Sequence, residues 1–344
     1  MAPVIRALSE SEELSCYLVH TDQHYDESLS KSFFSVLELP DPDEHLAVGS
    51  GTHHEQTAEG LRKIGTLINE REPGVVLAQG DTNAVLSTAI AASKTSASFG
   101  HIEAGIRSFD WRMPEEINRI VADSVADFAF APTETAMANL RNEGRSDSAY
   151  LTGNTVVDAC LAHRAMAQRK SNILSELEFD SESYVVATIH RPFNTDREGR
   201  LRQILTALDS TSVPVVLPVH PRTQAAIDTT DFTPEGSLNL VSPLDYLDFL
   251  KLLTNSLVAV TDSGGIQEEA SILEIPCLTV RPNTERQETV EAGVNRLVKP
   301  GDLQVELKTL ITDPSERAAM TGHKALYGDG NTGQQIVDIL ASKV

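Results

Sequence analysis

Residues 261–269 (TDSGGIQEE) have the residue types of a phosphate-binding turn. They follow the apolar run 257–260 and precede the apolar segment 270–273, which predicts a strand, a tight turn and a short helix. Backbone N–H groups at a helix N-terminus favour an anion by geometry and by the helix dipole, and glycines let it approach closely. Glu269 would lie about one and a half turns into this helix, within reach of an attached ribose. The alternative is an ordinary turn between strand and helix, with Gly for tightness.

The composition sets limits on the class of protein. The 344 residues suit two domains, and 40% are hydrophobic, enough for real cores. No apolar run approaches the ~20 residues of a transmembrane helix, so we expect no membrane partner. Glutamates at 10, 12 and 13 interrupt the first apolar stretch, so we expect no signal peptide. The three cysteines are far apart, which favours neither a disulfide framework nor a zinc knuckle, and we expect a cytoplasmic protein.

The net charge is −22, from 28 basic and 50 acidic residues. Nucleic-acid binding requires a basic surface, so we expect no nucleic-acid partner. The basic residues are 19 Arg and only 9 Lys. An acidic, Lys-poor surface is typical of adaptation to high salt, where screening removes self-repulsion, and we hold a halophilic origin as a hypothesis.

Apolar runs alternate with helical patterns along the chain, which predicts βα units and parallel sheets. The predicted strands are 15–20, 75–79, 97–102, 127–130, 148–151, 184–189, 213–219, 238–241, 256–260, 277–280 and 294–298. The predicted helices are 2–8, 56–70, 83–93, 115–124, 133–142, 155–169, 198–209, 222–228, 245–254, 264–273, 303–312, 315–325 and 332–342. The fold class is therefore α/β, with two doubly wound Rossmann-like domains facing a cleft. We place the first domain at 1–155, joined by 326–344, and the second at 156–325.

Polar residues follow the predicted strands at the edge where a doubly wound sheet binds its ligand. These segments are 80–82 (GDT), 101–107 (HIEAGIR), 190–191 (HR) and 218–222 (PVHPR). Basic groups at several strand ends of so acidic a protein suggest an anionic ligand. Each segment alone is a weak indication, because strand ends often carry polar residues.

The sequence resembles the non-hydrolysing UDP-N-acetylglucosamine 2-epimerases, especially the archaeal type. The matching segments cover nearly the whole chain: 79–83 (QGDTN), 100–110 (GHIEAGIRSFD), 113–119 (MPEEINR), 131–134 (APTE), 153–158 (GNTVVD), 220–222 (HPR), 261–269, 283–286 (NTER) and 327–330 (YGDG). The resemblance implies a fold of the glycosyltransferase-B type, whose C-terminal helix returns to the first domain. It implies inversion of C2 in UDP-GlcNAc to give UDP-ManNAc, by elimination of UDP and its re-addition. Neither a redox cofactor nor a metal is implied, and we expect a homodimer that binds a UDP-sugar.

The resemblance places the catalytic carboxylates at Asp81, Glu103 and Glu115. One group must remove the C2 proton and another must return a proton to the opposite face, and which carboxylate does which is open. Each residue also has a structural interpretation. Asp81 suits a turn after Gly80, Glu103 a salt bridge at a strand end, and Glu115 a helix start, where Pro and acidic residues are favoured.

The resemblance also assigns binding residues. His220 would bind the diphosphate or protonate the leaving group, with a structural histidine as the alternative. Ser263, Gly264 and Gly265 would hold the diphosphate, and Glu269 the ribose hydroxyls. Arg286 would neutralise phosphate through charge-assisted hydrogen bonds. Leu244 and Phe249 align with the uracil pocket, and Gln23-His24 with a segment that holds a second, activating UDP-GlcNAc in bacterial relatives.

The chain departs from the family pattern in three places. Phe193 stands where the family has Glu in His-Arg-x-Glu-Asn, and Gln287 stands where it has Pro. The family opens with an apolar strand and a Gly-Thr-Arg-Pro-Glu turn, whereas residues 1–8 match the helix after that turn. We therefore expect roughly 15 further residues, a strand plus a tight turn, upstream of Met1.

Four other functions remain open on the sequence. A hydrolysing 2-epimerase would release free ManNAc and UDP. A close variant would act on a diacetamido-uronic acid nucleotide, because the sequence does not fix the sugar's C3 and C6 substituents. A glycosyltransferase of the same fold would require an acceptor. A non-catalytic UDP-sugar sensor would bind without turnover.

Overall fold

The computed structural model describes residues 1–22, 39–322 and 326–343. The chain forms two compact units. The N-terminal unit comprises Met1–Ala159 and Tyr327–Val344, and the C-terminal unit comprises Cys160–Leu326. The C-terminal helix α17 (Thr332–Ala341) thus belongs to the unit that begins the chain, as the resemblance implies.

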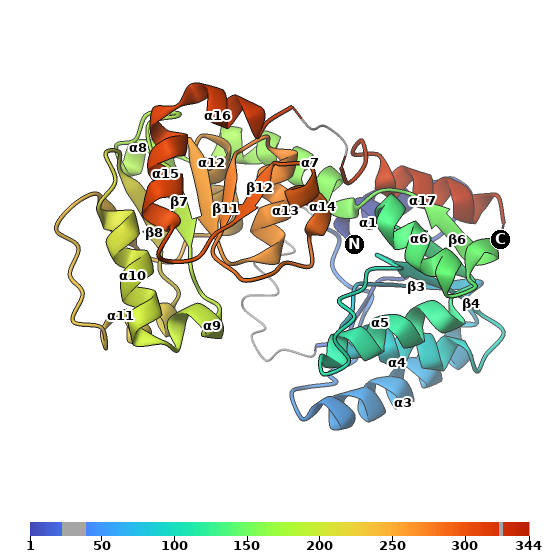
Figure 1. The fold of residues 1–344 in the computed structure, drawn as a ribbon. Coiled ribbons are helices and arrows are strands. Elements are labelled where there is room, and N and C mark those ends of the chain that lie inside the picture. Colours follow the sequence, from blue (N-terminus) through green and yellow to red (C-terminus); the bar gives the residue numbers. More distant parts are fainter. Residues whose placement is uncertain (23–38, 323–325, 344) are drawn as a thin grey trace. The chain divides into compact units, whose positions relative to one another are not determined.

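The N-terminal unit contains two parallel sheets with helices around them (Figure 1). Its strands are β1 (Val19–His20), β2 (Glu44–His45), β3 (Val75–Gln79), β4 (Ser98–Ile102), β5 (Phe128–Ala131) and β6 (Ala149–Leu151). Its other helices are α1 (Ala2–Glu10), α3 (His53–Arg71), α4 (Asn83–Ala92), α5 (Pro114–Val125), α6 (Glu134–Asn142) and the start of α7 (Thr155–Lys170). β1 pairs with β2, and the larger sheet has the order β3-β4-β5-β6.

The larger sheet is buried on both faces, as its alternating side chains require. Phe99 and Ala129 lie in one apolar cluster with α3 and α4, which also contains Ile64 and Val85. The alternate positions Ile102, Phe128 and Phe130 lie in a second cluster with Val4 of α1 and with Ile336 and Leu340 of α17. The first and last helices therefore cover one face of the sheet together.

The C-terminal unit has one parallel sheet of six strands in the order β12-β11-β10-β7-β8-β9. The strands are β7 (Val185–Thr188), β8 (Val215–Pro218), β9 (Leu238–Val241), β10 (Val258–Thr261), β11 (Cys277–Thr279) and β12 (Asn295–Leu297). The helices are α8 (Ile173–Glu176), α9 (Pro192–Thr195), α10 (Glu198–Asp209), α11 (Pro221–Ile227), α12 (Tyr246–Thr254), α13 (Gly264–Ile272), α14 (Gln287–Glu291), α15 (Leu303–Thr312) and α16 (Pro314–Ala319). This is the doubly wound order, whose switch point lies between β7 and β10.

The predicted α/β fold with two parallel-sheet units is confirmed, but two predicted elements are shorter than expected. The strand predicted at 15–20 is regular only over Val19–His20. Its partner β2 has two residues, and before it Pro42 has no N–H while the Asp43 carboxylate accepts from the N–H of Leu18. The helix predicted at 315–325 ends at Ala319, and Gly322 follows with a left-handed φ of +82° that no helix continues through.

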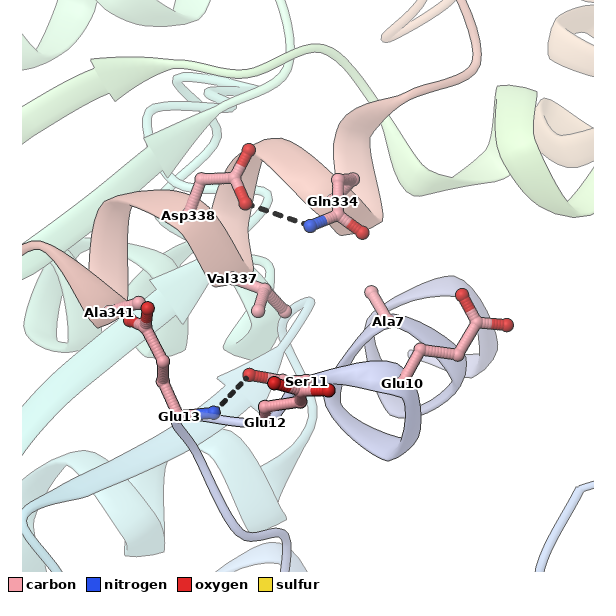
Figure 2. Close-up of a pocket in the computed structure, with 9 residues that line it drawn as sticks. All are labelled: Ala7, Glu10, Ser11, Glu12, Glu13, Gln334, Val337, Asp338 and Ala341. Atoms are coloured by element: carbon pink, nitrogen blue, oxygen red, sulfur yellow. Dashed lines mark hydrogen bonds between the residues drawn. The ribbon is translucent and has the colours of Figure 1, made fainter.

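A shallow pocket lies between α1 and α17 of the N-terminal unit (Figure 2). Its rim is acidic, with Glu10, Glu12 and Glu13 on one side and Asp338 on the other. None of the predicted site residues lines it. Over the described ranges, no helix combines the length and the apolar character that crossing a bilayer requires.

Candidate active site

Asp81 and Glu103 follow neighbouring strands of the N-terminal unit. β3 and β4 are parallel, with Gln79 opposite Ile102, so both strands end at the same edge of the sheet. The Gly80 N–H donates to the Ile102 carbonyl at 3.1 Å, which extends the pairing to the residues before Asp81 and Glu103. A Cβ built on Gly80 would lie 3.7 Å from Glu103 Oε2, so the Glu103 carboxylate stands beside the turn that carries Asp81. The two predicted carboxylates are therefore brought to one place.

The backbone of Glu103 is strained. Its φ is +71°, a left-handed conformation that a non-glycine residue adopts at a cost of about 1–3 kcal/mol. The hydrogen bond from the Ala104 N–H to the Phe130 carbonyl fixes the chain directly after it. The Gln79 amide donates to Glu103 Oε1 at 2.6 Å and so orients the carboxylate. Strain held in place by its surroundings is typical of functional positions.

Helix α5, which carries the third predicted carboxylate, Glu115, is bonded to Asp81 through two other residues. Arg119 donates two hydrogen bonds to Asp81 Oδ2, at 3.0 and 2.6 Å, and the Asn118 amide donates to the Asp81 carbonyl at 2.8 Å. Glu115 is one turn before Arg119 and so lies on the same face of the helix. Across the described part of the chain, no hydrogen bond holds the Glu115 carboxylate. The structural interpretation of Glu115 also persists, because α5 does begin at Pro114 with Glu115 in its first turn.

Glu116, next to Glu115 in sequence, has a structural role in holding the loop after β4. Its side chain is buried and accepts from the backbone N–H groups of Ser108 and Phe109, both at 2.9 Å. Burial alone would raise its pKa, but these bonds and those from the Ser108 hydroxyl and Arg119 hold the pKa below its ordinary value. Glu116 thus ties the loop after β4 to the start of α5. Sequence reasoning did not distinguish this structural role from that of Glu115.

A buried charge network lies beneath these carboxylates. His101 Nε2 lies 2.8 Å from the Gly80 carbonyl, and its Nδ1 faces Asp123. Because the carbonyl and the carboxylate both accept, both ring nitrogens must carry a proton, and His101 is an imidazolium. Asp123 also pairs with Arg107 at 2.7 Å and accepts from the Gly105 N–H at 2.9 Å. One carboxylate therefore holds both chain segments that flank Glu103.

The phosphate-type turn of the C-terminal unit has the predicted structure of strand, turn and helix. β10 ends at Thr261, Ser263 is the N-cap, and α13 begins at Gly264. The turn lies at the switch point between β10 and β7, where doubly wound sheets bind their ligands. The Ser263 side chain makes no capping hydrogen bond, so its hydroxyl is not engaged at the helix end. A Cβ on Gly265 would be 4.0 Å from any neighbour, so the chain is open there.

Asp262 organises the switch point, and the site prediction did not include it. Its side chain is fully buried and accepts from the N–H groups of His190 and Arg191 and from the Asn194 amide, the last at 2.9 Å. It thereby joins the loop after β7 to the turn after β10. The residue stood within the quoted turn, but its partners are about seventy residues away in sequence and leave no local signal.

Two histidines flank this switch point. His190 Nδ1 lies 3.2 Å from Asp262 Oδ1. Burial lowers the pKa of His190, Arg191 and His220 lower it further by their charge, and Asp262 opposes them. His220 follows β8, the parallel neighbour of β7, so both histidines stand two residues beyond strand ends at the same edge of the sheet. His220 itself is exposed.

Glu269 is a buried carboxyl within α13. It is 8% exposed, and its Oε2 has no hydrogen-bond partner among the described residues. Burial raises its pKa to about 7, and a hydrogen bond from Tyr246 opposes the rise. A buried acceptor without a donor is costly, so this position suits a ligand that supplies hydroxyl groups.

The remaining predicted binding residues border α13. Tyr246 begins α12, with Leu244 two residues before it and Phe249 one turn after it. Tyr246 is the group that opposes the rise in the pKa of Glu269. Both Leu244 and Phe249 are half-buried. Arg286 Nε pairs with Glu268 Oε1 at 2.6 Å, which holds the guanidinium beside α13.

Phe193, which departs from the family pattern, carries two arginines on its ring. Arg200 Cζ lies 4.2 Å and Arg197 Cζ 5.1 Å from the ring centroid, distances typical of cation–π contacts. Arg200 also donates to Asn194, which binds Asp262. At position 193, aromatic and guanidinium contacts therefore stand where the family has a carboxylate, while the Asp262 carboxylate holds the rest of the loop.

Comparisons with known proteins place the chain in a family. Residues 6–341 match the family model for UDP-N-acetylglucosamine 2-epimerase. The chain is 40% identical to the UDP-N-acetylglucosamine 2-epimerase of Methanocaldococcus jannaschii, over 99% of this chain and 94% of the relative. The chain belongs to the UDP-N-acetylglucosamine 2-epimerase family.

Another relative of the epimerase family acts on a different sugar. The UDP-2,3-diacetamido-2,3-dideoxy-D-glucuronate 2-epimerase of Pseudomonas aeruginosa is 39% identical, over 98% of this chain and 94% of the relative. Among solved structures, the M. jannaschii epimerase in complex with UDP-GlcNAc and UDP matches with a TM-score of 0.84 at 38% identity, over 99% of this chain and 95% of that one. This likeness confirms the predicted glycosyltransferase-B type of fold. The predicted second-site segment Gln23-His24 lies outside the described residues.

Proposed function

We propose that the protein is a non-hydrolysing epimerase of the archaeal type that interconverts UDP-GlcNAc and UDP-ManNAc. Family membership supports the reaction class. The observation that carries the proposal for this chain is the turn between β10 and α13, at the switch point of the C-terminal sheet. The Ser263 hydroxyl, which does not cap α13, stands at the start of the helix, and the buried Glu269 lies within it. This spacing suits a nucleoside diphosphate: the phosphates at the helix N-terminus and the ribose at the carboxyl.

We assign the substrate contacts from this arrangement. The backbone N–H groups of Gly264 and Gly265 and the Ser263 hydroxyl donate to the diphosphate. Glu269 accepts from the ribose hydroxyls. Arg286, held beside α13 by Glu268, adds positive charge, and His220 donates to the diphosphate or to the leaving oxygen. Leu244 and Phe249 border the uracil.

The N-terminal carboxylates supply the proton chemistry. As the C1–O bond breaks, its electron pair leaves on the UDP oxygen, a carboxylate takes the C2 proton, and the C1=C2 double bond of an acetamidoglycal forms. In the return step, the UDP oxygen attacks C1 and an acid delivers a proton to the other face of C2. We assign these roles to Asp81, Glu103 and Glu115 as a group. The Arg119–Asp81 pair and the Gln79–Glu103 bond orient two of them.

Product analysis tests the non-hydrolysing outcome. After incubation with UDP-GlcNAc, phosphorus and proton NMR should show UDP-ManNAc at equilibrium with substrate and no accumulation of UDP or free ManNAc. Stoichiometric UDP and ManNAc would instead identify a hydrolysing enzyme. A UDP-2,3-diacetamido-uronate substrate should be included in parallel, because a relative that acts on that sugar is 39% identical. Turnover of it alone would reassign the sugar while keeping the mechanism.

A further inference from the structure

Two histidines and one aspartate form a compact cluster where the small sheet of the N-terminal unit ends. His20 is the last residue of β1 and His45 the last residue of β2, and the two are register partners in a parallel pair. Their side chains therefore leave the same face of the sheet. Asp22 follows two residues after His20. One ring nitrogen of each histidine and a carboxylate oxygen of Asp22 lie within 4.8 Å of one another.

The cluster converges on one oxygen. His20 Nδ1 lies 2.5 Å and His45 Nδ1 lies 2.9 Å from the same Asp22 Oδ1. The two imidazole rings meet edge to face, with centroids 5.6 Å apart. The other carboxylate oxygen, Oδ2, accepts from the Ala47 N–H at 3.0 Å. This bond aims Oδ1 at the rings.

The backbone fixes this arrangement at some cost. Asp22 and Ala47 both have left-handed φ values, +52° and +48°, a conformation that non-glycine residues adopt only where their surroundings hold it. The loops are held by the bonds from Leu46 N–H to the His20 carbonyl at 2.9 Å and from Gly49 N–H to the Asp22 carbonyl at 3.0 Å. The Lys63 ammonium donates to the Leu46 and Ala47 carbonyls, at 2.7 and 2.8 Å. The three donors are therefore preorganised by contacts that do not involve the donor atoms.

We propose that His20, Asp22 and His45 bind a divalent transition metal ion of the zinc class. Two imidazole nitrogens and one carboxylate oxygen are a donor set that zinc prefers, and three protein ligands leave a position for water. Donors about 2.05 Å from a tetrahedral zinc are about 3.3 Å apart, so each N–O separation must open by less than about 1 Å. An imidazole that binds a metal through Nδ1 carries its proton on Nε2.

The site is open enough to load. The side chains of His20 and Asp22 are 31% and 28% exposed, and that of His45 is 54% exposed. A bound ion would join the ends of β1 and β2 and would stabilise the folded chain by mass action. This inference is independent of the proposed function, because none of the three residues is assigned to the substrate.

Zinc titration of the full chain tests the proposal. The protein, without a histidine tag and stripped by a chelator, is titrated with zinc chloride against a chromophoric chelator in the absence of UDP-sugar. We expect one equivalent to bind, and His45→Asn and Asp22→Asn each to weaken binding by about tenfold or more, since even indirect partners of a metal ligand contribute that much. His54→Asn, an exposed histidine of the same unit, is the matched control and should bind like the wild type.

Cobalt provides a second readout. Cobalt chloride should give the visible absorption of a four-coordinate ion in the wild type and in His54→Asn, but not in His45→Asn. Zinc should raise the melting temperature of the same two proteins only. If Asp22→Asn fails to fold, the comparison of His45→Asn with the wild type still tests the site, because His45 is half-exposed and its replacement leaves the core unchanged. No saturable zinc binding by the wild type, or equal binding by wild type and His45→Asn, overturns the site.

Discussion

His101 Nδ1 lies 2.5 Å from Asp123 Oδ1, and both side chains are completely buried. The pair connects the turn before Asp81, through the Gly80 carbonyl, with the loop after Glu103, through the Gly105 N–H. Burial acts to lower the pKa of His101, but Asp123 and the Gly80 carbonyl raise it above its ordinary value. Burial acts to raise the pKa of Asp123, but His101, Arg107 and the Gly105 N–H bring it below its ordinary value. The charged pair is thus the stable form.

Asp123→Asn should destabilise the protein by about 3–5 kcal/mol, because it leaves the His101 and Arg107 charges without their buried counterion. The stabilisation by Asp123 is present above its ordinary pKa of about 3.9 and is lost as the pH falls through its lowered value. The stabilisation by His101 is complete below about pH 6.5 and is lost as the pH rises through its raised value. Denaturant unfolding of wild type and variant between these limits measures the difference. The exposed Asp147→Asn is the control, and an equally small effect of both variants would contradict the role of the pair.

Asp81→Asn, Glu103→Gln and Glu115→Gln should each reduce turnover by about two to four decades, because each removes a proton donor or acceptor but keeps the size of the side chain. UDP affinity should stay nearly unchanged, since the proposed UDP contacts are in the other unit. Steady-state kinetics and calorimetry measure the two quantities. Glu70→Gln, an exposed residue of α3, serves as the control. If any of the three variants turns over substrate at close to the wild-type rate, the replaced residue has only a structural role and takes no part in the proton transfer.

Ser263→Ala should weaken UDP binding about tenfold to a hundredfold, the usual effect of losing a hydrogen bond to a charged group. The helix should not suffer, because this side chain does not cap it. Gly264→Ala should also weaken binding, since its Cβ would lie 2.7 Å from Glu285 Oε1 and would narrow the space at the start of α13 where we place the diphosphate. Calorimetry with UDP is the measurement, with Ser271→Ala near the end of α13 as control. Unchanged affinity in both variants would show that this turn does not hold the diphosphate.

UDP-sugar binding should strengthen as the pH rises through about 7. The pKa of Glu269 is about 7 because of burial, and ribose hydroxyls donate best to the ionised carboxylate. Binding should therefore lower this pKa and release a proton. Calorimetry in buffers of different ionisation enthalpy measures that proton, and a UDP-sugar is the suitable ligand because its diphosphate does not titrate near pH 7. Glu269→Gln should abolish the pH dependence, whereas a dependence retained in this variant would assign it to another group.

Parts of the fold and site with a local signal were predictable from the sequence. The turn after β10 is one example, since the apolar run, the glycines and the start of α13 are contiguous. The predicted strand ends likewise led us to expect Asp81 and Glu103 at one edge of the sheet. The parallel register of β3 and β4 agrees with this placement. The assigned roles of these residues remain predictions.

Long-range contacts had no such signal. The partners of Asp262 come from the loop after β7, and Asp123 reaches back to His101 across twenty-two positions. The cluster of His20, Asp22 and His45 depends on the pairing of two strands of two residues each, which are too short to show a period of two. The shortened strand β1 has the same cause, because its length is set by its partner and not by its own apolar residues.

Incubation with UDP-GlcNAc in deuterium oxide tests the central claim, removal and return of the C2 proton, most directly. If an N-terminal carboxylate takes the proton and exchanges it with solvent, proton NMR should show loss of the C2 signal from the UDP-ManNAc formed and progressively from the UDP-GlcNAc pool. Asp81→Asn, Glu103→Gln and Glu115→Gln should slow this loss in parallel with turnover. Formation of UDP-ManNAc that retains the original C2 proton would contradict the account.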